Sequence, residues 1–120
     1  MKRMELVATA GPGTEVDLMA VNADGTQHPF TVAAGSPFIV TDISIQRETV
    51  LPGPTLFAVN ITQKPPDSHQ LRWAFVGSIS QNVERSFSTG MVFSTPFFIQ
   101  NAMEDPNAPA VIVRLWGFTE

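Results

Sequence analysis

The histidines are the first residues of this chain whose type could do chemistry. There are two, His28 and His69, and neither has a second histidine within one turn or strand of it. A metal site of the cupin type needs two or three histidines and a carboxylate at short spacing on facing strands. We therefore expect His28 to lie at a strand end, His69 to lie in a loop, and no metal or cofactor to be bound.

Carboxylates occur in two close pairs, Glu15 with Asp17 and Glu104 with Asp105, while Asp42 stands alone. A glycosidase needs two acids about 5 Å or about 6.5–9.5 Å apart, and Glu15 and Asp17 could reach that separation. Because apolar residues alternate with them, we interpret them instead as the solvated face of an edge strand. The chain has no cysteine, which excludes a thiolate nucleophile and a zinc–sulfur site. We expect a protein that is not an enzyme.

The two tryptophans, Trp73 and Trp116, could each present a flat face to a sugar ring. Trp73 shares an alternating pattern with core candidates, so we interpret it as a core residue. Trp116 lies opposite the better core set of its strand. A carbohydrate-binding β-sandwich, in which Trp116 stacks on a sugar beside Asn, Gln and Asp side chains, is therefore the alternative function.

Composition limits the remaining function classes. The chain has 120 residues, 43% of them hydrophobic and only 15% charged, with a net charge of −4. This length fits one domain, residues 1–120. The basic residues are scattered, so we expect no nucleic-acid binding. The beginning lacks the apolar stretch of a secretory signal and no run could span a membrane. We expect a cytoplasmic protein, or part of a particle assembled there.

The elements that must position these residues are β-strands. Eight Gly and ten Pro divide the chain into short segments with period-2 alternation of Val, Ile, Phe and Thr. The pattern predicts an all-β, two-sheet antiparallel β-sandwich of eight or nine strands, a strand count that fits both a jelly roll and an immunoglobulin-like sandwich. Asp24 and Gly25 are expected to form a hairpin turn with positive φ angles. Strands are predicted at about residues 5–9, 15–21, 27–33, 38–47, 55–63, 70–79, 84–93, 97–102 and 110–118.

Alternation along these strands predicts which side chains face the core. In FIVTDISIQ the inward set is Ile39, Ile43 and Ile45, which leaves Phe38 and Val40 on the opposite face. The inward residues of LRWAFVGSI are Leu71, Trp73, Phe75 and Ile79, with Gly77 marking a bulge or a close backbone approach.

The order of these stretches resembles that of small jelly-roll sandwiches. GSPFIVTDISIQ resembles their early strand, SFSTGMVFSTPFFIQ their penultimate pair, and VIVRLWGFTE the closing strand that returns through the middle of a sheet. The ending is similar to that of trimeric jelly rolls of the tumour necrosis factor and complement globular-head type, and to jelly-roll modules of phage and bacterial particles. The resemblance implies association around a threefold axis.

Several strands carry apolar residues on both faces, which favours a self-associating, non-enzymatic module with a structural, attachment or binding role. We expect a homo-oligomer, with a trimer favoured, and other particle proteins or a glycan as further partners. Arg114 would need a carboxylate or carbonyl partner on the neighbouring copy. The alternative is that loops of the same chain, including PGP and EDPNAP, cover this face. The expected interface residues are Phe38, Val40, Phe98, Ile112, Arg114, Trp116 and Phe118.

Overall fold

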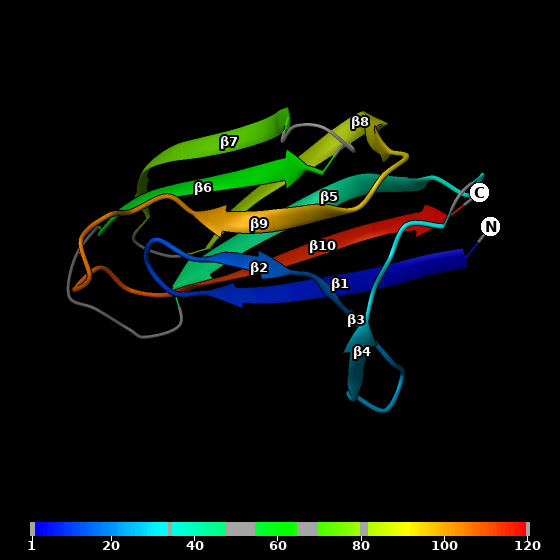
Figure 1. Ribbon diagram of the computed structural model, residues 1–120, viewed down its shortest axis with the longest axis horizontal. Helices are drawn as coiled ribbons and strands as arrows, with labels where there is room; N and C mark the ends of the chain where they lie inside the picture. Colours follow the sequence, from blue (N-terminus) through cyan, green and yellow to red (C-terminus); the bar gives the residue numbers. More distant parts are fainter. Residues whose placement is uncertain (1, 34, 48–54, 65–69, 80–81, 120) are drawn as a thin grey trace.

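The computed structural model describes residues 2–33, 35–47, 55–64, 70–79 and 82–119. These residues contain no helix that could span a membrane. They form an all-β fold of two packed antiparallel sheets, which confirms the predicted sandwich (Figure 1). The strands are β1 (Lys2–Ala10), β2 (Glu15–Asp17), β3 (Met19–Val21), β4 (Gln27–Pro29), β5 (Phe38–Arg47), β6 (Thr55–Gln63), β7 (Gln70–Ile79), β8 (Val83–Phe93), β9 (Phe97–Asn101) and β10 (Val111–Thr119).

The strand order is that of a jelly roll with one added hairpin. The six-stranded sheet runs β4-β3-β1-β10-β5-β8 and the four-stranded sheet runs β2-β9-β6-β7. Without β3 and β4, eight strands remain in two four-stranded sheets, and most consecutive strands lie in opposite sheets. As predicted for the closing strand, β10 returns through the middle of a sheet, between β1 and β5 (Figure 1).

The predicted strand at 15–21 is two strands in different sheets. Leu18 separates β2 from β3 and is 2% exposed, so its side chain fills the corner where the chain crosses the core. The predicted strand at 27–33 is limited to β4, and His28 lies in it, exposed to solvent. Gly25 takes a φ of 88° in the β3–β4 hairpin, whereas Asp24 does not have the positive φ that we predicted.

The core lies between the sheets and draws on all the long strands. Phe57, Val59 and Ile61 from β6 are completely buried. Phe93 and Phe97 stack with ring centroids 4.1 Å apart, and together with Phe38 they form an aromatic cluster near one end of the sandwich. At roughly 1.5–3 kcal/mol for each large side chain, this burial is the main stabilising term of the fold.

A β-bulge in β5 changes the predicted inward set of that strand. Asp42 pairs with Trp116 and Val40 pairs with Gly117, so Thr41 is an extra residue with no residue opposite it in the β10 ladder, although its hydroxyl donates a hydrogen bond to the Trp116 carbonyl. An extra residue shifts the alternation by one position. Phe38 and Val40, each 0% exposed, therefore face the core together with Ile43 and Ile45. The prediction that Phe38 and Val40 lie on the outer face is wrong.

A second bulge, in β7, has the same effect on Leu71. Ile61 pairs with Trp73 and Thr62 with Leu71, so Arg72 is the extra residue. Leu71 is 59% exposed instead of buried, and the Arg72 guanidinium lies over the Phe93 ring, 4.8 Å from its centroid.

Two of the other inward residues predicted for β7 do face the core. Trp73 and Phe75 pack against the core as predicted, while the side chain of Ile79 lies outside the described set. Gly77 marks neither a bulge nor a close backbone approach: it pairs in register with Phe57, and the atoms nearest to a Cβ there belong to the Phe75 ring, at 3.2 Å.

Candidate functional site

The outer face of β10 carries four of the predicted interface residues. Ile112, Arg114, Trp116 and Phe118 alternate with the buried core residues of the strand and point away from the core, as expected. All four are only half-buried. Because β10 lies between two long strands, side chains of β1 and β5 flank them, and Trp116 is opposite Glu5 on one side and Asp42 on the other.

Arg114 has an ion-pair partner within its own subunit. Its Nη1 lies 3.8 Å from Oε2 of Glu5 on β1, and the two side chains are 37% and 29% exposed. This pair removes the need for a carboxylate on a neighbouring copy, which was part of the sequence-based expectation. Because both groups remain partly in water, the pair contributes little to stability.

The other predicted interface residues are not available to a partner. Phe38 and Val40 are core residues, as described above. Phe98 does face away from the core, but it is 1% exposed, and Nζ of Lys64 lies 4.9 Å from the centroid of its ring. Of the seven predicted positions, the structure therefore places only the four on β10 together on one accessible face. The PGP loop at 52–54, proposed as a possible cover, lies outside the described residues.

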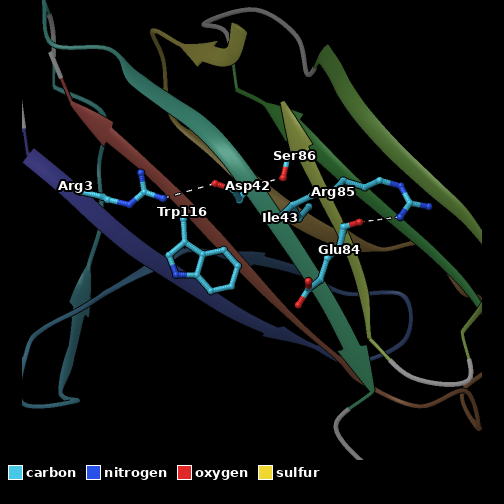
Figure 2. Close-up of a pocket in the computed structure, with 7 residues that line it drawn as sticks. All are labelled: Arg3, Asp42, Ile43, Glu84, Arg85, Ser86 and Trp116. Atoms are coloured by element: carbon cyan, nitrogen blue, oxygen red, sulfur yellow. Dashed lines mark hydrogen bonds and ion pairs between the residues drawn. The ribbon is translucent and has the colours of Figure 1, made fainter. Parts of the chain in front are cut away.

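Trp116 lines an open depression of about 380 Å³ on the outer face of the six-stranded sheet. Figure 2 shows its indole beside β10, with Arg3 and Glu84 to either side of it. The depression is lined by Arg3, Asp42, Ile43, Glu84, Arg85, Ser86 and Trp116, and we call it the Trp116 depression. Alternation in FIVTDISIQ places Asp42 on the face opposite Ile43, but it does not bring Asp42 together with residues of β8.

Asp42 is held in place by three neighbours in this depression. Its Oδ1 accepts a hydrogen bond of 2.7 Å from the Ser86 hydroxyl, and its Oδ2 accepts one of 2.8 Å from Thr41. Arg3 Nη2 lies 3.6 Å from the same Oδ2 (Figure 2). The hydrogen bond from Ser86, with the further help of Thr41 and Arg3, lowers the pKa of Asp42 below its ordinary value. The carboxylate is thus charged and fixed in orientation.

A second candidate surface lies on the outer side of β6 and β7 and was missed by the sequence analysis. Leu56, Leu71 and Val76 are 52%, 59% and 72% exposed. Ala58 and Ala74 lie on the same face, since Ala58 pairs with Val76 and Ala74 pairs with the polar Asn60. We call these five uncharged residues the β6–β7 face. Strand alternation could have identified four of the five residues, because it places Leu56 and Ala58 opposite Phe57, and Ala74 and Val76 opposite Phe75.

The strand β7 also forms one edge of its sheet. Among the described strands its only hydrogen-bonded neighbour is β6, although it is ten residues long. An edge strand of this length exposes backbone N–H and C=O groups that can pair with another chain. The other edge of the same sheet is β2, which has only three residues.

The residues considered first for catalysis and metal binding are dispersed. Within the described ranges no three His, Cys, Asp or Glu side chains gather as a metal site would require. Glu15 and Asp17 are exposed on the edge strand β2, as expected, and Asp17 forms an ion pair of 2.8 Å with Lys64. His69 lies outside the described residues.

No protein-family model and no curated protein sequence matches this chain. The resemblance to trimeric jelly rolls and to particle modules therefore stays a prediction.

Proposed function

We propose that this protein is a self-associating jelly-roll module without catalytic activity, which serves as a structural or attachment part of a larger assembly or as an oligomeric binding protein. The observation that carries the proposal is the combination of the apolar β6–β7 face with the unpaired edge of β7. Either feature alone is common on soluble domains, but a long edge strand that is also apolar is a pairing surface that monomeric proteins normally avoid.

A second copy of the chain is the occupant that fits this surface best. The exposed side chains of the β6–β7 face carry no charge, so two copies meet there without like-charge repulsion. Two identical edge strands can pair antiparallel about a twofold axis, which continues the four-stranded sheet from one subunit into the next. Arg72, the charged residue of β7, lies over Phe93 and stays clear of this contact.

This geometry favours a dimer over the trimer that the family resemblance implies. When β7 of one subunit pairs antiparallel with β7 of a second subunit, neither strand has a free edge left, so the assembly is complete with two subunits. The half-buried residues of β10 lie on the other sheet and do not take part in such a contact. A trimer built through the outer face of β10 would instead have to bury the Glu5–Arg114 ion pair.

Light scattering coupled to size-exclusion chromatography tests the proposal at tens of micromolar protein. We expect a dimer for the natural chain and a monomer for Val76→Lys, because pairing of the two β7 edges brings the new lysines of both copies onto one face of the joined sheet, where like charges repel. Val92→Lys is the matched control, since Val92 is also an exposed valine on a strand but lies in the other sheet, where it is 44% exposed. A natural chain that is strictly monomeric overturns the proposal, as does a dimer that survives Val76→Lys.

A further inference from the structure

The Trp116 depression has the size and the mixed lining of a small-molecule site. Its volume of about 380 Å³ falls within the range of roughly 300–1,000 Å³ typical of ligand pockets. Such pockets combine an apolar surface with a few polar groups that fix the orientation of the ligand. Here the apolar surface is the indole of Trp116, and the polar groups come from three other strands, β1, β5 and β8 (Figure 2).

The charges of the depression select against an anion. Asp42 and Glu84 contribute two carboxylates, and Arg3 contributes a guanidinium that lies beside Asp42. The guanidinium of Arg85 lies over the Phe75 ring, 5.8 Å from its centroid. Arg85 therefore points to the other side of β8 and does not offer its charge to a ligand in the depression. An anionic ligand would therefore meet two negative groups and only one positive group. A neutral ligand that both donates and accepts hydrogen bonds matches this set.

The polar groups of the depression retain free hydrogen-bonding capacity. A carboxylate offers about four acceptor sites, and the hydrogen bonds from Ser86 and Thr41 use two of those of Asp42, while Arg3 lies beside it at ion-pair distance. In the described part of the chain the Glu84 carboxylate makes no hydrogen bond or ion pair, since only its backbone oxygen accepts a bond, from Arg85. Asp42 is thus a rigid acceptor and Glu84 a movable one.

A pyranose ring has complementary chemistry, because it presents a face of C–H groups and a rim of hydroxyl groups. An indole packs against the C–H face, while carboxylates accept protons from adjacent hydroxyls. We propose that the Trp116 depression binds a neutral saccharide, with Trp116 stacking on the ring, Asp42 and Glu84 accepting hydrogen bonds from its hydroxyls, and Arg3 donating one. This site lies on the six-stranded sheet, away from the β7 edge, and is independent of the proposed self-association.

Saturation-transfer NMR on the full chain tests this inference with a panel of glucose, galactose, mannose, N-acetylglucosamine, lactose and cellotriose. We expect at least one neutral sugar to bind with millimolar affinity, and N-acetylneuraminic acid, which carries a carboxylate, not to bind. Trp116→Ala should weaken binding about tenfold, because it removes both the stacking and the apolar area that the indole offers to the sugar ring.

Two further variants keep the test decisive. Glu84→Gln, on the exposed side of the edge strand β8, retains the shape of the side chain and should weaken binding several-fold with the fold unchanged. Trp73→Phe, on the other sheet, should bind as the natural chain does. The inference is overturned if no neutral sugar binds at tens of millimolar, if the acidic sugar binds best, or if binding survives Trp116→Ala unchanged.

Discussion

Gly117 occupies the most restricted position along the closing strand, and Gly117→Ala should destabilise the protein strongly. It lies at the bulge between β10 and β5, directly after Trp116. A Cβ added there would lie 2.0 Å from the carbonyl oxygen of Ile39 and 3.0 Å from Cζ of Phe38. The closer contact is with backbone, and both strands are paired on their two sides in the six-stranded sheet, so neither can retreat without breaking a second ladder.

The magnitude follows from this overlap. Inserting a methyl group into a packed site costs about 1–3 kcal/mol, and an overlap with fixed backbone of more than 1 Å belongs at or above the upper end. We expect a loss of about 3 kcal/mol or more in the free energy of unfolding, which for a chain of this length lowers Tm by about 10 °C or more. Urea unfolding followed by circular dichroism, at one fixed protein concentration, measures the loss.

Gly11→Ala is the matched control, because a Cβ at Gly11 would meet nothing within 4 Å. We expect this variant to stay within about 0.5 kcal/mol of the natural chain. If Gly117→Ala were as stable as Gly11→Ala, the close approach of β5 and β10, and with it the bulge that orients Trp116, would be refuted.

Three other variants test the core, the β7 edge and the acid response. Phe38→Ala should lower the free energy of unfolding, measured with urea, by about 3–5 kcal/mol, because Phe38 is 0% exposed. A variant that keeps its subunit stability but no longer forms oligomers would contradict this and would indicate that Phe38 lies at an interface. Ala74→Cys should be crosslinked into a dimer by a short bismaleimide, whereas His28→Cys, on the distant hairpin, should not; equal crosslinking of both would contradict pairing through β7. The lowered pKa of Asp42 implies a stabilisation that is complete above the ordinary aspartate pKa and is lost as pH falls through the lower folded-state pKa. Asp42→Asn should therefore show a smaller loss of urea midpoint between about pH 5 and pH 2 than the natural chain, and an identical acid profile would count against the hydrogen bond from Ser86.

Alternation predicted the faces correctly where strands are regular and failed where they are not. On β10 the outward positions of Trp116 and Phe118 follow from period 2 alone. On β5 and β7 the single extra residues Thr41 and Arg72 reverse the faces of Phe38 and Leu71, and nothing in the local sequence marks either bulge. Bulges depend on how two strands are paired, which is a property of the whole sheet.

The same reasoning explains why the Trp116 depression was only partly foreseen. The sequence places Asp42 and Trp116 on outer faces, but their alignment depends on the register of β5 against β10. Ser86 is 44 positions from Asp42 in the chain, and their hydrogen bond requires β8 to pair with β5 across another irregular register. The β6–β7 face, by contrast, needs no pairing information for Leu56, Ala58, Ala74 and Val76, because strand alternation alone places them opposite Phe57 and Phe75.

The two flanks of the sandwich differ in the length of their edge strands, and the β3–β4 hairpin contributes to this difference. On one flank the sheets end in β4 and β2, which have three residues each, whereas on the other they end in β7 and β8, with ten and eleven. The hairpin projects away from the sandwich and extends the short flank (Figure 1). If the protein self-associates through its long edge strands, as proposed, both lie on the same flank, so pairing would close after two subunits and would not continue into a filament.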